Sequence, residues 1–323
     1  MRFSFLLVVA ALIVAAQTKK SYDYFHLGKS EAPRTKTSSG FLLAGGGRTP
    51  DDAYRWFAAK AGTGEIVTLR ASGGDGMNQT FLDAGAAAAS TLVFNERSAA
   101  SDPFVVAKIR AAAGVFIAGG DQSKYVAYWK GTPVGDALNE LVAKGVPVGG
   151  SSAGLAILGE FGFSAERDTI TSKAALANPF DPAVTISTEF VRIPLLRGII
   201  TDTHFGRRDR MGRTLVFLAR LAQDGRARPA SSIAVDEGNA VLLEPDGSAT
   251  VSGSGYAYFI RTTGALEICE AGKPLSMGGF NVYRVGRAGK FDVKAWRGEG
   301  GTAYTLSVEA GEVRSTQPGG GIY

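Results

Sequence analysis

Residues 146–158 have the sequence VPVGGSSAGLAIL, and this stretch decides the fold. An apolar run, 146–148, is followed at once by glycine and serine and then by a second apolar run from Leu155. That order predicts a buried strand, a sharp turn and a helix. Strand and helix patterns alternate in the same way from Phe41 to Val235. They predict an α/β fold, a three-layer sandwich around a mostly parallel central sheet, which the short β segments beyond Ala240 are expected to extend.

The turn in this stretch has the spacing of a nucleophile elbow, Gly150-x-Ser152-x-Gly154. Small flanking residues allow the strained backbone that presents a serine hydroxyl above a sheet, and the amide of Ala153 then points at the developing oxyanion. The N-terminus of the following helix adds a favourable field. The pattern therefore predicts Ser152 as a nucleophile, in preference to Ser151. The alternative interpretation is an ordinary glycine–serine turn.

A nucleophilic serine needs a base, and the chain has only two histidines. His26 lies in a polar segment before the first core strand, whereas His204 directly follows an expected strand, 198–201. The carboxyl ends of parallel strands share one edge of a sheet, where such folds hold their ligands. We therefore expect His204 to lie beside Ser152. A hydrogen-bonded structural histidine is the alternative.

Two carboxylates could orient the imidazole of that histidine. Asp236 and Glu237 follow the expected strand 232–235 and should lie at the same edge of the sheet. The residues alone do not choose between them. Asp202 is also near in sequence but, two residues before His204, is better placed to contact substrate.

A second group of polar residues, 119–122, ends the expected strand 114–118. The amide of Gly120 is a candidate oxyanion donor together with that of Ala153. Asp121 and Gln122 are candidates for holding amide or ammonium groups of a substrate. Asp121 is equally suited to cap the next helix.

Four arginines follow the candidate base, at positions 207, 208, 210 and 213. Guanidinium groups bind carboxylates bidentately, and arginine at a helix N-terminus opposes the helix macrodipole. The cluster therefore indicates an acidic ligand such as an aspartyl peptide. The alternative is a solvated start of a helix.

Composition argues against several other functions. The net charge is +5 with basic residues scattered, so a nucleic-acid partner is not expected. The single cysteine, Cys269, excludes an internal disulfide. One cysteine and two histidines also argue against a transition-metal site, and no cofactor is expected. The triplet 45–47 lacks the later glycine of a dinucleotide fingerprint, because Pro50 stands there. Gly28-Lys29-Ser30 lacks the first glycine of a phosphate loop.

Residues 1–16 are expected to form a signal peptide. Arg2 precedes an apolar run that is too short for a comfortable membrane span. Cleavage before Gln17 would leave a polar leader, 17–38, and a secreted or periplasmic protein with no membrane association. An uncleaved anchor is the alternative. The glycine-rich tail, 297–323, is expected to be mobile at its end.

Four motifs occur in an order that resembles the cyanophycinase and peptidase E family of serine peptidases: FIAGGDQ at 116–122, GGSSAG at 149–154, DTHF at 202–205 with the arginines after it, and VDE at 235–237. The resemblance covers residues 39–296. It implies a class I glutamine amidotransferase-like fold and a triad of Ser152, His204 and Glu237, which favours Glu237 over Asp236. The substrate-site residues that it implies are Gln122, Asp202, Arg208, Arg210 and Arg213.

That family resemblance implies hydrolysis of cyanophycin, a polyaspartate with arginines on its β-carboxyls, through an acyl-enzyme that releases β-Asp-Arg dipeptides. One position departs from the pattern, because cyanophycinases usually have glutamine where this chain has Thr203. Two alternatives follow: an Asp-Xaa or isoaspartyl dipeptidase, and a non-catalytic binding protein on the same fold. The expected partner is a peptide or a cyanophycin-like polymer, and a homodimer is left open.

Overall fold

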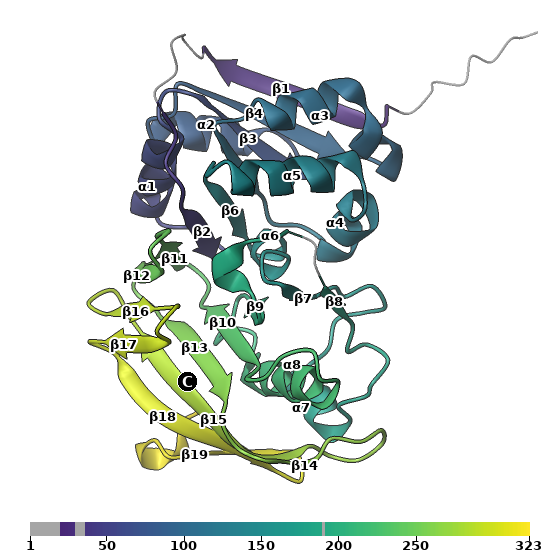
Figure 1. The fold of residues 1–323 in the computed structure, drawn as a ribbon, viewed down its shortest axis with the longest axis vertical. Helices are drawn as coiled ribbons and strands as arrows, with labels where there is room; N and C mark the ends of the chain where they lie inside the picture. Colours follow the sequence, from purple (N-terminus) through teal and green to yellow (C-terminus); the bar gives the residue numbers. More distant parts are fainter. Residues whose placement is uncertain (1–19, 30–35, 189–190) are drawn as a thin grey trace, which may run out of the picture.

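The computed structural model describes residues 20–29, 36–188 and 191–323. The expected signal peptide, 1–16, lies outside the described residues. The described strands form two sheets, which Figure 1 shows one above the other, and the chain crosses between them repeatedly.

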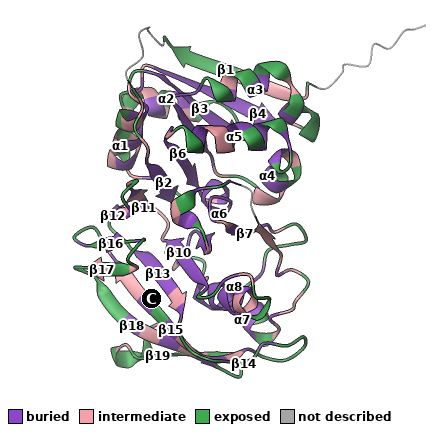
Figure 2. Cartoon of the chain, in the orientation of Figure 1, coloured by how far each residue is buried: buried purple, intermediate pink, exposed green. Residues whose placement is uncertain are grey.

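The first sheet has ten strands with a parallel centre. Its order is β1-β4-β3-β5-β6-β2-β11-β12-β16-β17. The five central strands, β4 to β2 in that order, are all parallel and almost wholly buried (Figure 2). The bounds are β1 Tyr22–Gly28, β2 Phe41–Ala44, β3 Glu65–Arg70, β4 Ala88–Phe94, β5 Gly114–Ile117, β6 Val148–Ser151, β11 Ala240–Leu243, β12 Ser248–Ser252, β16 Lys290–Asp292 and β17 Arg297–Glu299.

Helices cover both faces of this parallel centre, as the strand–helix alternation predicts. α1 (Asp51–Ala61) and α2 (Gly76–Asp83) bury Phe57 and Phe81 against one face. On the other face lie α3 (Pro103–Arg110), α4 (Gln122–Trp129) and α5 (Pro133–Ala143), with the short helix η1 (Arg97–Ser101). This half of the molecule is therefore the expected three-layer sandwich.

The second sheet is mostly antiparallel, and its order is β19-β18-β15-β13-β10-β9-β7-β8, with β14 beside β15. The helices α7 (Ser172–Ala177) and α8 (Met211–Gln223) share a core with it. The bounds of its strands are β7 Phe161–Phe163, β8 Ile186–Thr188, β9 Ile199–Asp202, β10 Ser231–Val235, β13 Ala257–Thr262, β14 Leu266–Ile268, β15 Ser276–Val285, β18 Thr302–Glu309 and β19 Glu312–Ser315. Three short helices, α6 (Ala153–Ala156), η2 (Pro194–Leu196) and η3 (Pro318–Gly320), complete the described elements.

The expectation of one mostly parallel central sheet is therefore wrong. β9 and β10, expected in that sheet, pair with each other in the second one. The β segments after Ala240 extend the first sheet through β11, β12, β16 and β17, and the others build the second. Short turns join them, and short turns allow only antiparallel pairing, so the C-terminal third could not continue a parallel sheet.

The two ends of the described chain also differ from expectation. Residues 22–28, expected in a leader before the core, form β1, which pairs antiparallel with β4 at the edge of the first sheet. Residues 297–323, expected to be a tail with a mobile end outside the folded domain, contain β17, β18 and β19. β17 pairs with β16 in the first sheet, and β18 pairs with β15 along most of its length in the second, so this segment is part of both sheets. The domain limits 39–296 otherwise stay a prediction.

Candidate active site

Ser152 stands at a strained turn between β6 and a short helix, α6 (Ala153–Ala156). Its backbone has φ 53° and ψ −118°, a conformation that costs a non-glycine residue on the order of 1–3 kcal/mol. A Cβ at Gly150 would lie 2.5 Å from the carbonyl carbon of Gly154, and a Cβ at Gly154 would overlap the carbonyl oxygen of Ile117. Both glycines of the elbow motif are therefore required by close backbone approach. The serine itself is half-buried.

The helix after the elbow is much shorter than the apolar run from Leu155 predicts. It ends at Ala156, and the chain turns back into β7 at Phe161. Four residues make only one turn, so the favourable field expected from this helix is small. What the turn does provide is the amide of Ala153, which as the first helical residue has no partner within the helix.

His204 lies directly against the serine. Its Nε2 is 2.7 Å from Ser152 Oγ, and its Nδ1 is 2.7 Å from Glu237 Oε2. The backbone of His204 has φ 47° and donates to the carbonyl of Gly45 over 2.7 Å. A hydroxyl, an imidazole and a carboxylate from three separate segments thus form one continuous hydrogen-bonded line, with His204 as a whole only 6% exposed.

The structure also distinguishes the roles of Asp236 and Glu237, which the local sequence leaves open. Asp236 accepts from the amide of Gly206 at 2.9 Å and from that of Tyr256 at 3.3 Å, so it fixes backbone rather than the imidazole. Burial raises the pKa of Asp236. Glu237, one residue later, is the carboxylate that reaches His204.

Electrostatics keep the imidazole neutral and the carboxylate charged. Burial lowers the pKa of His204, and the nearby cations Arg208 and Arg210 lower it further, against the opposing effect of Glu237. The hydrogen bond from His204 lowers the pKa of Glu237, with help from Arg207 and Arg208. The ring can therefore accept a proton near neutral pH while an ionised carboxylate stabilises the imidazolium that forms.

The glycine triplet after β2 shapes this arrangement, a role that the sequence analysis missed. Gly46 has φ 97°, and a Cβ there would overlap Nε2 and Cε1 of His204. Gly47 has φ 67°, and a Cβ there would press on Cγ of Glu237. The available signal was the position of the triplet, at the carboxyl end of a buried strand that neighbours the strand of Ser152.

The residues after β5 surround the serine from the other side. A Cβ on Gly119 would lie 3.4 Å from Cβ of Ser152, so Gly119 is adjacent to the serine, whereas a Cβ on Gly120, the expected oxyanion donor, would meet the hydroxyl of Tyr125. Asp121 accepts from the amide and the hydroxyl of Ser123 and so caps α4, which is the alternative raised for it above. Gln122 is half-buried and reaches the carbonyl of Phe163 at 3.4 Å.

Three residues expected to bind substrate are instead buried against one another. Asp202 accepts from Arg213 Nε and from Thr214 Oγ1, each at 2.9 Å, and a second nitrogen of Arg213 also donates to it. Thr203 donates its amide to Asp202 at 2.7 Å. Asp202, Thr203 and Arg213 are each at most 3% exposed. Burial alone would raise the pKa of Asp202, but Arg213 and Arg210 hold it below its usual value.

This buried network corrects the expectation of substrate contact for those three residues. α8 starts immediately against the end of β9, so the arginine in its first turn faces the aspartate of the strand rather than solvent. Arg210 is also drawn in, because it donates to the carbonyl and hydroxyl of Thr203 at 2.8 and 2.9 Å. Burial and the neighbouring arginines lower the pKa of Arg210 to about 10.

Two arginines of the cluster remain at the surface. Arg207 is 74% exposed in its side chain and lies 3.6 Å from Glu237 Oε1. Arg208 is exposed and contributes positive potential at His204. These two guanidinium groups are therefore the ones available to a carboxylate ligand.

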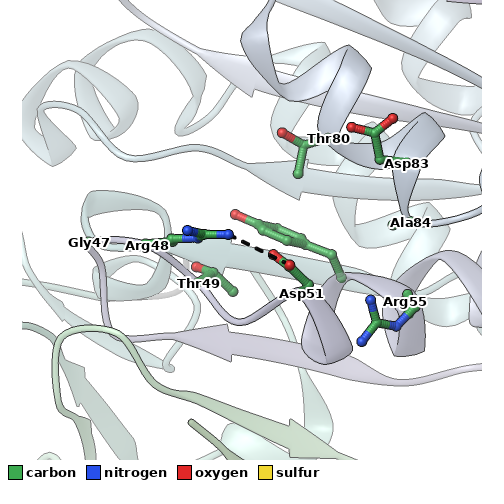
Figure 3. A pocket seen from close by; sticks show the side chains of 9 residues that line it. Gly47, Arg48, Thr49, Asp51, Arg55, Thr80, Asp83 and Ala84 are labelled. Carbon is green, nitrogen blue, oxygen red and sulfur yellow. Dashed lines mark ion pairs between the residues drawn. The ribbon is translucent and has the colours of Figure 1, made fainter.

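A pocket of about 410 Å³ lies beyond the glycine triplet, between the starts of α1 and the end of α2 (Figure 3). Arg48 and Asp51 form an ion pair across 3.7 Å in it. Gly47, which contacts Glu237, forms part of its wall, whereas Ser152 does not line it. The lining carries both signs of charge and consists of Gly47, Arg48, Thr49, Asp51, Tyr54, Arg55, Thr80, Asp83 and Ala84.

Cys269 is buried directly after β14, and burial raises the pKa of its thiol to about 11. Within residues 20–29, 36–188 and 191–323, no three His, Cys, Asp or Glu side chains gather in a way that could hold a metal ion. No helix in those same ranges has the length and hydropathy needed to cross a bilayer.

Comparison with known proteins assigns the sequence of this chain to a family. The model of peptidase family S51 aligns with residues 75–249, more than half of the chain, and the aligned range contains Ser152, His204 and Glu237. The chain belongs to peptidase family S51. Since this is a family of serine peptidases, the protein is a serine-type hydrolase whose substrate is a peptide.

Relatives of this S51 peptidase are distant. It is similar to the cyanophycinase of a Nostoc species, with 28% identity over 216 residues, 65% of this chain and 67% of that one. A cyanophycinase from Synechococcus elongatus is 30% identical over 177 residues, 54% of this chain and 50% of its own. A crystal structure of a peptidase from an acI-B1 Actinobacterium superposes with a TM-score of 0.53 at 14% identity, covering 70% of this chain and 91% of that one, which supports the fold.

Proposed function

We propose that this S51 peptidase hydrolyses aspartyl peptide bonds of the cyanophycin type through an acyl-enzyme on Ser152. The observation that carries the proposal is the hydrogen-bonded line from Ser152 Oγ through His204 to Glu237, with 2.7 Å at each step. The names of the distant relatives, cyanophycinases, support the substrate class.

The chemistry proceeds by two transfers at one carbonyl. Ser152 Oγ attacks the amide carbon while its proton passes to Nε2 of His204, and Glu237 stabilises the imidazolium through Nδ1. The amides of Ala153 and Gly120 hold the oxyanion. The C–N bond breaks as His204 returns the proton to the leaving amine, which leaves an ester on Ser152. Water attacks that ester, gives its proton to His204, and Ser152 departs with the proton returned.

The surroundings of the site fit an acidic peptide. Arg207 and Arg208 are exposed beside Glu237 and His204, where they could pair with a free carboxylate of an aspartyl unit. The nearby pocket combines Arg48 and Arg55 with Asp51 and Asp83, so it offers partners for both the carboxylate and the guanidinium of a β-Asp-Arg unit. Export through the N-terminal apolar segment, to the periplasm or the medium, is part of the same proposal because the polymer would be met outside the cell.

A shorter aspartyl substrate is the second candidate. Asp202 and Arg213, to which the resemblance to cyanophycinases assigns substrate contact, are occupied by each other. An Asp-Xaa or isoaspartyl dipeptide needs only the exposed arginines, so this observation favours it.

One assay separates the candidates. The full chain is incubated with insoluble cyanophycin and, separately, with Asp-Arg and isoaspartyl dipeptides, with Ser152→Ala as the inactive reference. Release of β-Asp-Arg by the unaltered chain alone supports the polymer. Cleavage of dipeptides without polymer turnover selects the dipeptidase. If the chain cleaves neither substrate and a fluorophosphonate does not label Ser152, both peptidase candidates are contradicted and a binding protein remains.

A further inference from the structure

The loop that carries the candidate base is held in an unfavourable backbone conformation. His204 and Asp209 both have φ of 47°, a left-handed conformation that is unfavourable for non-glycine residues. The loop from 204 to 210 also presents Arg207 and Arg208 beside the site. Backbone bonds within the loop, such as that from the Arg208 amide to the carbonyl of His204 at 3.0 Å, support this shape, and contacts from outside the loop add to that support.

Tyr323 contacts this loop at Asp209, one of its two residues with positive φ. Its hydroxyl donates to Asp209 Oδ1 at 2.8 Å and accepts from the amide of Met211 at 3.0 Å. The amide of Met211 is the first of α8, so the helix itself gives it no partner. One hydroxyl therefore ties the end of the loop to the start of the next helix.

The ring of Tyr323 also packs against the same loop. It meets the ring of Phe205 edge-on at 5.7 Å and that of Tyr258 at 6.1 Å. Phe205, the residue after His204, is fully buried in this contact. Gln317 in turn donates to the carbonyl of Tyr323 at 3.3 Å, so the tyrosine is itself fixed in place.

We propose that Tyr323 is a positioning residue, which sets the loop of His204, Arg207 and Arg208 for the reaction without touching substrate. The kinetic part of this inference rests on the proposed function, whereas the structural part does not. With the tyrosine hydroxyl gone, the loop loses the anchor at the Asp209 side chain and keeps only the bond from Ser172 to the Asp209 carbonyl. Arg208 then moves away from the imidazole, and water enters around the ring.

Both changes act on His204 in the same direction. Burial and Arg208 depress the pKa of the imidazole, so loss of either raises it. Besides Asp209, which bonds Tyr323, the loop itself and the segments packed against the ring carry further charged groups. They are Glu237 and Asp236 after β10, Asp202 at the end of β9, Arg207 and Arg210 on the loop, and Arg213 on α8.

The test is a proton NMR titration of the histidine rings in the full chain. In Tyr323→Phe the pKa of His204 should rise relative to the unaltered chain, because burial and Arg208 then depress it less. The matched control is Tyr283→Phe, which removes a hydroxyl that accepts from the amide of Gly301 at 3.0 Å, and it should leave the titration of His204 unchanged.

A second variant covers the case in which Tyr323→Phe does not fold. Asp209→Gly removes the acceptor at a position whose φ suits glycine. Loss of a negative charge alone would lower the pKa of His204, so a rise in this variant reports loop release. A His204 titration that is unchanged or lowered in the folded variants overturns the inference.

Kinetics supply the second readout. In Tyr323→Phe, KM for an acidic peptide should rise about 5- to 10-fold with a smaller change in kcat, because the arginines bind the carboxylate less well. A chain with no aspartyl peptidase activity would contradict the proposed function, but the NMR titration would still decide the role of Tyr323. Unchanged KM in an active, folded Tyr323→Phe would also overturn the inference.

Discussion

Gly46 lies directly against the imidazole of His204, so closely that a Cβ on residue 46 would overlap Nε2. The backbone carbonyl of its neighbour, Gly45, holds the His204 amide. The glycine turn after β2 therefore determines where the base can stand relative to Ser152. That relationship makes the turn part of the active-site architecture although it supplies no reactive group.

Gly46→Ala should disable the enzyme and also lower stability, because alanine is strained at the φ of 97° that residue 46 adopts. The added methyl group displaces the ring from the Ser152 hydroxyl, and we expect kcat to fall at least about 100-fold, since misplacement by about 1 Å has that effect. The matched control is Gly85→Ala, where φ is 101° and a Cβ meets nothing within 4 Å. Steady-state kinetics measure both. Retention of full kcat in Gly46→Ala would contradict the placement of His204.

The two neighbouring carboxylates should behave differently. Glu237→Gln leaves the ring without its ionised partner, and kcat should fall by about 10²- to 10⁴-fold with the melting temperature nearly unchanged. Asp236→Asn weakens the bonds to Gly206 and Tyr256, so it should lower stability more than kcat. Kinetics and thermal unfolding together separate the pair. The reverse pattern would assign the role to Asp236.

The pH dependence follows from the direction of the His204 pKa. The neutral ring accepts the serine proton, so kcat/KM should fall as the pH drops through the pKa of folded His204. That pKa lies below its ordinary value, about 6.5, so the acid limb should lie below that pH as well. Arg208→Gln removes a cation that depresses the pKa and should move the limb upward, whereas Arg314→Gln on β19 should not. A limb above the ordinary range in the unaltered chain would contradict the electrostatic assignment.

The stability of the fold should depend on pH in the same direction. The folded-state pKa of His204 is depressed, so protonation favours the unfolded chain. The stabilising contribution of His204 is therefore present above its unfolded-state pKa and is lost as the pH falls through its folded-state pKa.

Asp202 should act on stability and Arg207 on substrate binding. Removing one partner of the buried Asp202–Arg213 pair leaves an uncompensated charge, so Asp202→Ala should reduce the free energy of unfolding by about 3–5 kcal/mol. Arg207→Ala changes an exposed side chain and should raise KM with no change in unfolding. Denaturant titration and kinetics measure the two. Normal stability with raised KM in Asp202→Ala would restore it to the substrate site.

Local sequence was sufficient for the elbow and for the choice of base. The run before Ser152 is apolar, its glycines match the spacing that a sharp turn needs, and the scarcity of histidine left His204 as the candidate. The alternation of strand and helix in the parallel half followed from apolar periodicity. Strands between Ala240 and Val285 were recognised as β segments, whereas those within 297–323 were not, and the division of all of them between two sheets depends on pairing across long stretches of chain, which periodicity does not encode.

The features that sequence reasoning missed all depend on contacts between distant segments. Nothing near Gly46 indicates that a histidine 158 positions later needs its missing side chain. The arginine cluster looked uniform along the chain, but helix α8 turns Arg213 toward Asp202 and leaves Arg207 in solvent. β1 was taken for a leader because its residues are mixed in polarity, as an edge strand with one exposed face requires.

The most direct test of this account compares two adjacent serines. Ser152→Ala and Ser151→Ala are assayed on an aspartyl peptide, and the unaltered chain is analysed by mass spectrometry after reaction with a fluorophosphonate. We predict a loss of about 10³-fold or more in kcat for Ser152→Ala, near-normal turnover for Ser151→Ala, and the adduct on Ser152. Peptide cleavage that persists in purified Ser152→Ala, or an adduct on another residue, would contradict the central role of Ser152.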